Sequence, residues 1–302
     1  MSCMFVLRLL AHIPRFLRLI LSLLAIPAYA QQPSNAAPAL RLSCVEAVWC
    51  DIAQQVGGST VQTYALIHSE GLDPHHLQPS PLMAQQLAQS DAILLNGATY
   101  DDWAKPLHAA SSKLFIAADY ADWHIGDDPH LFFDLPTVHK TAQRIAEWLS
   151  TNRPQARADI SQNLARFERD VARLSTQLER LRHVVPNAPF AMTEPAGERL
   201  LYAAGLHMID EGWARALMNE SGLSPRDTAQ LETAIQHKEI RFLVRNPALE
   251  APQAHAVEAL TQQAHIPIIT IGESLPAGLH WQDWLGHILT IIETTLTQQA
   301  TP

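Results

Sequence analysis

The sequence predicts an α/β protein with two doubly wound (β/α)4-type lobes, each built on a parallel sheet, joined by one long rigid helix. Three observations support this fold class: short apolar runs alternate with helical segments, the alternation occurs twice, and a long amphipathic segment separates the halves. Continuous apolar strands separated by helices indicate parallel sheets covered on both faces. Open α/β sheets bind ligands beyond the carboxyl ends of their strands, so we expect a site in the cleft between the lobes.

The first 30 residues resemble a secretory signal peptide. Three arginines precede an apolar stretch at 19–26, and Ala28-Tyr29-Ala30 supplies the small-residue pattern for cleavage after Ala30. The apolar stretch is short for a membrane span, although an uncleaved anchor is an alternative. We therefore expect a periplasmic mature protein, with a flexible start at 31–39 and no stable membrane anchor.

Removing this segment takes away three arginines and no acidic residue, which changes the formal net charge from −9 to −12. Such an acidic surface argues against nucleic acid or an anionic membrane as the partner and favours cations. About 270 mature residues are long for one core and comfortable for two lobes. We expect a monomer.

The N-terminal lobe is expected over residues 40–153. Its predicted strands lie at 40–45, 61–67, 92–95 and 114–118, and its helices at 46–56, 81–89, 101–110 and 137–150. The linking helix, 154–185, carries apolar residues at three- and four-residue steps, namely Leu164, Phe167, Val171, Leu174, Leu178 and Leu181. That one-sided stripe predicts packing within the chain, over roughly 35–40 Å at ~1.5 Å per residue.

The C-terminal lobe is expected over residues 186–302, including a closing helix. Its predicted strands lie at 190–193, 207–209, 241–244 and 266–271, and its helices at 198–204, 252–264, 281–296 and after Ser224. Ser224 followed by Pro225 is typical of a helix start.

Two stiff loops carry histidines. Three prolines keep Asp73-Pro74-His75-His76-Leu77-Gln78-Pro79-Ser80-Pro81 out of helices and central strands, and a second Asp-Pro-His stands at 128–130. A ligand that is held in place beforehand loses little entropy on binding, so the repeat favours a metal site. The alternative is simple turn chemistry, with each imidazole exposed or capping a helix. In the second half, Glu194 and Glu273 follow predicted strands, as both histidine loops do.

In this order along the chain, the motifs resemble those of periplasmic zinc- or manganese-binding proteins of ABC importers, the cluster A-I (ZnuA/TroA-like) solute-binding family. The resemblance covers residues 40–298 and rests on Asp73-Pro74-His75 with Pro79-Ser80-Pro81, Asn96-Gly97 with Trp103, Asp128-Pro129-His130, Thr193-Glu194-Pro195 ahead of Tyr202, and Gly272-Glu273-Ser274-Leu275. It implies capture of a divalent metal and its delivery to a membrane permease.

The resemblance also implies four metal ligands, two from each lobe: His75, His130, Glu194 and Glu273. Glu194 stands where many relatives have histidine, and Glu273 where aspartate is common. The long acidic, histidine-rich loop of many zinc receptors is absent from the sequence.

Two imidazoles and two carboxylates form a mixed set that is harder than an all-histidine site, which favours manganese or iron. Intrinsic affinity still favours zinc over manganese, and a tetrahedral set of this kind is ordinary for zinc. We therefore predict Zn²⁺ as the transported ligand, with Mn²⁺ as the alternative. Asp73 and Asp128 either orient the histidines or only cap their loops.

Cys44 and Cys50 remain after signal cleavage, in an oxidising compartment that permits a disulfide. The alternative is two small buried side chains. His68, His76 and His124 lie near the predicted mouth of the cleft, either as surface residues or as a weak auxiliary site.

Two other functions were weighed. A zinc hydrolase would keep one coordination position open, and the sequence has no His-Glu-x-x-His, Gly-x-Ser-x-Gly or phosphate loop. A receptor for a metal chelate or tetrapyrrole would need a wide, aromatic-lined cleft, which the ligand loops do not predict. We therefore predict a binding protein and no enzyme.

Overall fold

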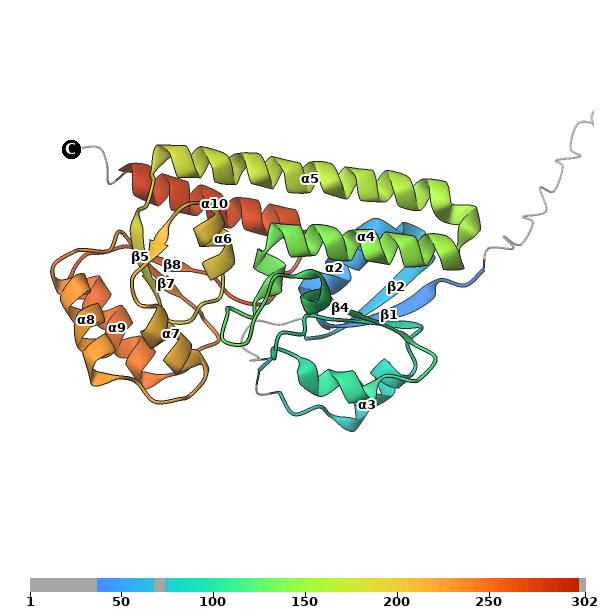
Figure 1. Ribbon diagram of the computed structural model, residues 1–302, viewed down its shortest axis with the longest axis horizontal. Helices are drawn as coiled ribbons and strands as arrows, with labels where there is room; N and C mark the ends of the chain where they lie inside the picture. Colours follow the sequence, from blue (N-terminus) through green and yellow to red (C-terminus); the bar gives the residue numbers. More distant parts are fainter. Residues whose placement is uncertain (1–36, 68–73, 76, 299–302) are drawn as a thin grey trace, which may run out of the picture. The chain divides into compact units, whose positions relative to one another are not determined.

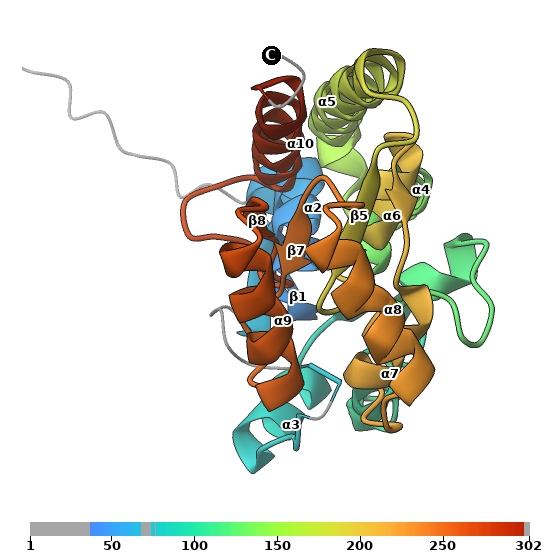
Figure 2. The same cartoon turned by 90° about the vertical axis from the view of Figure 1, so that its left-hand side faces the viewer.

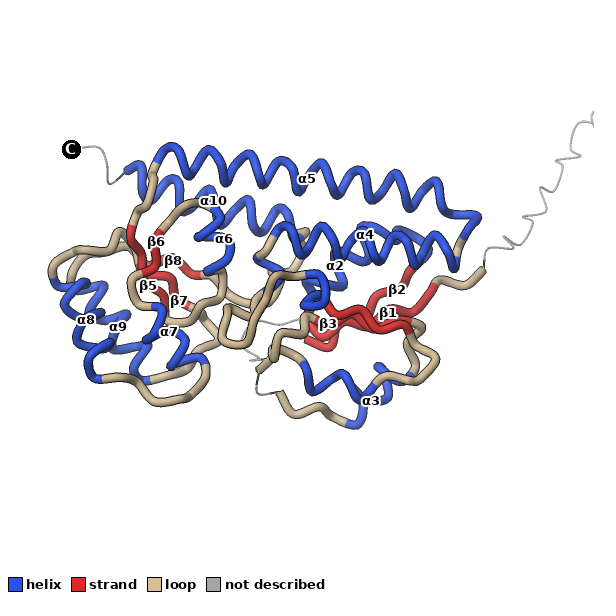
Figure 3. The backbone as a smooth tube through the Cα atoms, in the orientation of Figure 1, coloured by secondary structure: helices blue, strands red, loops and turns tan. Residues whose placement is uncertain are grey.

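The computed structural model describes residues 37–67, 74–75 and 77–298. The described residues from Ala39 onward form one compact unit. Two four-stranded parallel sheets lie in this unit, one in each half of the chain, and Figure 3 shows them in red between layers of helices. The predicted fold class, with two α/β lobes and a long connecting helix, is therefore confirmed.

The N-terminal sheet has the strand order β2-β1-β3-β4. The elements of this lobe are β1 (Leu40–Glu46), α2 (Ala47–Gly57), β2 (Val61–Ile67), α3 (Pro81–Ala88), β3 (Ala92–Leu95), β4 (Lys113–Ile116) and α4 (Leu135–Asn152). The chain leaves β1 toward β2 on one side and then crosses to β3 on the other. This reversal creates a switch point between β1 and β3, where their carboxyl ends can receive a ligand.

The C-terminal sheet repeats the same topology, with the strand order β6-β5-β7-β8. Its elements are β5 (Pro189–Met192), α6 (Glu198–Ala203), β6 (His207–Met208), α7 (Glu211–Met218), α8 (Pro225–Gln236), β7 (Leu243–Arg245), α9 (Pro252–Gln263), β8 (Ile268–Thr270) and α10 (Trp281–Gln298). The equivalent switch point lies between β5 and β7.

Two long helices join the lobes. Helix α5 (Arg157–Val184) runs along both of them, and α10 lies beside it, starting near α2 and running back over the C-terminal lobe (Figures 1 and 2). One hydrophobic cluster is continuous from Trp49 in α2, through Phe167 in α5, to Phe190 in β5 and Trp281 in α10. Since a shared core resists shear between its halves, this arrangement favours small lobe movements over a wide hinge.

The first turn of α10 is anchored on the N-terminal lobe. The backbone N–H of Trp281 donates to Oδ2 of Asp51 at 2.8 Å, and Nδ1 of His280 donates to Oδ1 of the same carboxylate at 2.7 Å. The Trp281 indole also donates to the Phe132 carbonyl at 2.7 Å. A carboxylate at a helix amino end satisfies free N–H groups and complements the helix dipole.

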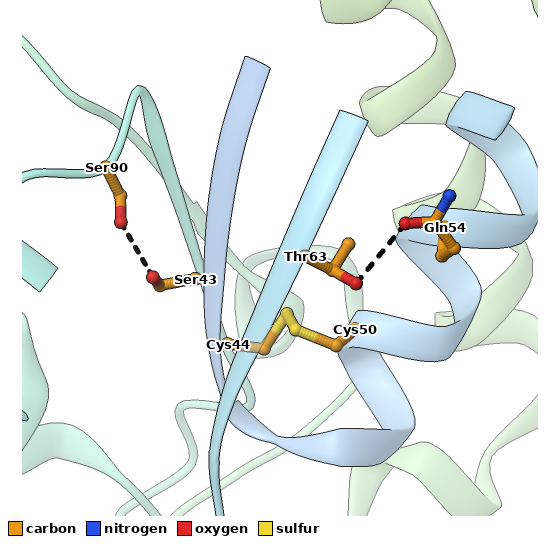
Figure 4. Close-up of a disulfide and its surroundings, with 6 residues drawn as sticks. All are labelled: Ser43, Cys44, Cys50, Gln54, Thr63 and Ser90. Carbon is orange, nitrogen blue, oxygen red and sulfur yellow. Dashed lines mark hydrogen bonds between the residues drawn. A yellow bond between two sulfur atoms is a disulfide. The ribbon is translucent and has the colours of Figure 1, made fainter. Parts of the chain in front are cut away.

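The structure joins Cys44, in β1, to Cys50, in α2, by a disulfide with a Cα–Cα distance of 5.5 Å (Figure 4). Of the two possibilities for this pair, the bridge is the one that the structure contains. It closes the β1–α2 turn, where Glu46 ends the strand.

Two local predictions were wrong. The helix expected at 101–110 is a 3₁₀ segment, Asp102–Leu107, with Pro106 inside it; a proline in that place removes a backbone donor and prevents a regular α-helix. Helix α7 was not expected. None of the helices in the described part of the chain combines the length and apolar character that crossing a bilayer requires.

Candidate metal centre

His75 lies in the loop after β2. The Pro74 carbonyl accepts a hydrogen bond from the Trp103 indole at 3.1 Å, which ties the loop to the 3₁₀ segment after β3. The His75 ring packs edge-on against Tyr100, with 4.7 Å between ring centroids. Trp103 thus holds the loop and Tyr100 packs on the imidazole. Asp73 lies outside them, so its predicted role stays a prediction.

His130 is fully buried, and its backbone and ring are both held by Asp128. The His130 backbone N–H donates to Oδ1 of Asp128 at 2.9 Å, and ring Nδ1 donates to the same oxygen at 2.6 Å. When Nδ1 carries the proton in this bond, Nε2 presents its lone pair for a metal. Asp128 thus has contacts that fit both roles considered for it: it caps the loop through the backbone N–H and holds the ring through Nδ1.

The loop around Asp128 is held in turn from both lobes. Nδ2 of Asn96, at the carboxyl end of β3, donates to the Pro129 carbonyl at 2.8 Å. Nε and Nη2 of Arg199, in α6, donate to the Asp128 carbonyl at 2.9 and 2.7 Å. These bonds fix the His130 loop against both sheets.

Glycine is required beside Asn96. Gly97 has φ +72°, and a Cβ there would lie 2.5 Å from Cγ2 of Ile116. A side chain would therefore both strain the backbone and displace β4. The structure therefore explains both residues of the Asn96-Gly97 motif: Asn96 holds the His130 loop, and Gly97 fits where a side chain would not.

The four predicted ligands converge. One ligand atom from each of His75, His130 and Glu194 lies within 4.8 Å of the others. Glu273 adjoins this group, with its Oε2 3.3 Å from Nε2 of His130. Zinc bonds to N and O donors are about 2.0–2.2 Å long, so donors sharing one ion lie about 3–4 Å apart. The arrangement has the size of a single-ion site.

The electrostatics of the group favour the charged forms of His130 and Glu273, which lie in contact. Burial disfavours the charged form of His130, but the carboxylates of Glu273 and Asp128 outweigh burial and raise the pKa of His130 well above its ordinary value. Burial also opposes ionisation of Glu273, yet His130 and then His75 hold the pKa of that carboxyl at about 2. Without a cation, the two side chains form an ion pair.

Glu46 is a further buried acid beside the group. Burial, followed by the charges of Glu273 and Asp101, raises the pKa of Glu46 well above its ordinary value. This shift favours the neutral form of Glu46, which adds no negative charge behind the site.

Two residues of the centre were missed in the sequence. Asn246 follows β7 and donates from Nδ2 to Oε2 of Glu194 at 2.5 Å and to Oε1 of Glu273 at 2.6 Å. Tyr100 packs against both imidazoles, with centroid distances of 4.7 Å to His75 and 5.4 Å to His130. The available signal for Asn246 was its position just after a strand, a position that Glu194 and Glu273 share.

The suggested auxiliary histidines gain little support. His124 is 78% exposed, and its Nδ1 lies 3.7 Å from Oδ2 of its neighbour Asp127. His68 and His76 lie outside the described residues.

A bilobed α/β fold whose strand ends direct two imidazoles and two carboxylates at one small volume defines a metal-binding receptor. The family model described as zinc-uptake complex component A, periplasmic, matches residues 44–295, and the chain belongs to this family. It is a solute-binding protein for metal, of the kind that serves ABC importers.

Solved structures with the same fold include three metal-protein relatives at low identity. The laminin-binding protein Lmb of Streptococcus agalactiae is 17% identical, with a TM-score of 0.73 and coverage of 85% of this chain and 99% of that chain. The periplasmic zinc-binding protein TroA of Treponema pallidum is 16% identical, with a TM-score of 0.71 and coverage of 85% and 99%. A ZnuA structure is 20% identical, with a TM-score of 0.71 and coverage of 85% and 98%. No curated protein sequence matches the chain.

Proposed function

We propose that the protein captures one Zn²⁺ in the periplasm through His75, His130, Glu194 and Glu273 and delivers it to the permease of an ABC importer. The observation that carries this proposal is the convergence of these side chains, three of which bring ligand atoms within 4.8 Å of one another. They come from both lobes, so a bound ion would hold the lobes together. Family membership and the zinc-binding protein TroA, which has the same fold, support zinc as the cargo.

Burial supports capture of a free ion. His130, Glu194 and Glu273 are each at most 5% exposed, and the volume between them is small. A chelate or tetrapyrrole needs a wide cleft, so the geometry favours a bare cation. Four protein donors also leave no open position for a catalytic water, in keeping with a binding protein rather than a zinc hydrolase.

The proposal is tested by metal content. The mature protein should hold about one zinc per chain after loading and dialysis, as measured by elemental analysis and competitive titration. His130→Ala should lose binding by at least about 100-fold, because the variant removes a ligand and leaves Glu273 without its buried partner.

His124→Ala is the matched control, since it removes an exposed histidine from the same lobe. It should bind zinc as the parent does. Equal zinc affinity in His130→Ala and the parent would refute the ligand set. If the parent protein bound manganese in preference to zinc, the site would stand and the proposed cargo would change to manganese.

A further inference from the structure

Asn246 bridges the two carboxylates of the metal centre. Its side chain is 2% exposed, and its amide nitrogen donates to Oε2 of Glu194 and Oε1 of Glu273. An amide nitrogen has two hydrogens, so these two bonds use its whole donor capacity. Charge-assisted bonds of this kind are stronger than neutral ones.

The orientation of the amide follows from its other contacts. Oδ1 of Asn246 accepts a hydrogen bond from the backbone N–H of Ala248 at 3.0 Å. The opposite orientation would lose that bond and would turn Oδ1 toward two carboxylate oxygens. The Asn246 backbone N–H also donates to Oγ1 of Thr193 at 3.1 Å, which ties the residue to the end of β5. Nδ2 is therefore the atom that faces the acids.

Each bond engages one oxygen of a carboxylate and competes with a metal ion for the electron density of that oxygen. On Glu273 the other oxygen, Oε2, faces Nε2 of His130 at 3.3 Å. Building on the proposed function, we propose that Asn246 restricts Glu194 and Glu273 to one metal-binding oxygen each and thereby selects zinc over manganese. Two imidazoles and two single oxygens make a four-donor set, which suits tetrahedral zinc. Manganese prefers a larger, oxygen-rich set, which a carboxylate binding through both oxygens helps to provide.

A purely structural role for Asn246 gives a different expectation. If the amide only stabilised two buried negative charges, its loss would weaken both metals by the same factor. If the amide limits the number of donor oxygens, its loss lowers the affinity for zinc and leaves the affinity for manganese nearly unchanged. The ratio of the two affinities therefore separates the roles.

The experiment compares the mature parent with Asn246→Ala by competitive titration with zinc and with manganese. Zinc affinity should fall by about 10–100-fold, the usual cost of losing a partner that orients metal ligands. Manganese affinity should change by less than about 3-fold, so the zinc-to-manganese ratio should fall at least about 10-fold. Cobalt absorption supplies a second readout, since the intense visible bands of four-coordinate Co²⁺ should weaken as further oxygens bind.

Asn96→Ala is the comparison variant. Asn96 follows the third strand of its own sheet as Asn246 does, but its amide holds the Pro129 carbonyl rather than a carboxylate. Asn96→Ala should lower the affinities for zinc and manganese by a common factor. Asn246→Ser keeps one donor and should give an intermediate ratio, and it serves as the test if the alanine variant fails to fold. Circular dichroism of the metal-free variants checks folding.

Equal losses for zinc and manganese in Asn246→Ala, or a cobalt spectrum like that of the parent, would overturn the inference. Both results would leave the proposed function intact, because the parent would still bind zinc. Failure of the proposed function has a separate signature, namely unchanged zinc binding in His130→Ala.

Discussion

Asp128 sets both the position and the tautomer of His130. One carboxylate oxygen receives the backbone N–H and the ring Nδ1–H of the histidine, so the ring cannot rotate without losing a bond. Arg199 holds the carbonyl of the same aspartate and lies 3.8 Å from its Oδ2. The basicity of the metal-facing nitrogen therefore depends on a residue that does not touch the metal.

Asp128→Asn should lower zinc affinity by about 10–100-fold, because a neutral amide is a weaker acceptor for Nδ1–H. Zinc competition titration of the folded variant checks this. Asp127→Asn is the control: its side chain is 49% exposed and lies beside His124. The orienting role would be contradicted by an Asp128→Asn variant with the zinc affinity of the parent.

Glu198 is a buried acid near Asp128 whose charge state is finely balanced. Burial, then the charge of Asp128, raises its pKa to about 7, although Nη2 of Arg215 donates to its Oε1 at 2.7 Å. Between its unfolded value of 4.5 and about 7, the folded state binds more protons than the unfolded state. Glu198 therefore lowers the free energy of unfolding as the pH rises through this window.

Glu198→Gln should remove that dependence. Between pH 5 and pH 8, the ionisation of Glu198 should lower the free energy of unfolding of the metal-free parent by about 1–3 kcal/mol. The variant should show a correspondingly smaller change in the free energy of unfolding over the same range. Urea unfolding at several pH values measures the difference. Glu232→Gln, on the exposed side of α8, should keep the parent profile. A variant profile as steep as that of the parent would exclude Glu198 as the source.

Among the secondary-structure elements, the β1–α2 turn is held covalently by the Cys44–Cys50 disulfide. The bridge joins the end of a central strand to the helix that packs on it. Glu46, the last residue of β1, lies within the bridged segment and beside the metal centre.

The bridge should contribute about 2 kcal/mol to stability, the value expected for a short closed loop. Denaturant unfolding of the oxidised protein should therefore shift to lower denaturant when a reductant is added. A Cys44→Ala/Cys50→Ala double variant should unfold at the same lower denaturant concentration, and its midpoint should not change when reductant is added. An unchanged midpoint on reduction of the parent would contradict the prediction.

The sequence predicted those elements and ligands whose evidence is local. Proline-stiffened Asp-Pro-His loops pointed to His75 and His130, whereas Glu194 and Glu273 were noted after predicted strands and assigned as ligands through the family resemblance. Asn246 was missed because an Asn-Pro pair is ordinary turn chemistry. Its function depends on contacts with residues 52 and 27 positions away, which no local pattern contains.

The secondary-structure prediction failed where segments were short. Helix α7, Glu211–Met218, has eight residues, too few to show a clear helical period. The closing helix was predicted, but its contact with Asp51 was not, because an amphipathic stripe does not identify the surface that covers it.

At the scale of the whole molecule, hydrogen bonds as well as shared core join the lobes near the metal. Arg199 in α6 binds the Asp128 carbonyl, and Nη1 of Arg215 in α7 donates to the Gly126 carbonyl at 2.6 Å. Both arginines belong to the C-terminal lobe and both acceptors to the N-terminal lobe. They hold the loop that carries His130 against the half that carries Glu194.

Arg199→Ala should release zinc about 10-fold faster than the parent, because the His130 loop loses the two bonds that Arg199 donates to it from the opposite lobe. Stopped-flow transfer of zinc to a chelator measures the rate. Arg226→Ala removes an exposed arginine from the same lobe and should leave the rate unchanged. Equal release rates in Arg199→Ala and the parent would show that the Arg199 bonds do not limit zinc release.

The anchoring of α10 has a consequence for the order in which the metal centre can form as the chain is made, because α10 is the last helix described. A nascent chain that emerges amino end first presents His75 and His130 well before Glu273 and the final helix, which starts at Trp281 of 302 residues. Until then Phe132 lacks its indole donor and Asp51 has no helix end to cap. We expect the unfinished polypeptide to be a poor chelator, so that only fully translocated molecules compete for scarce ions.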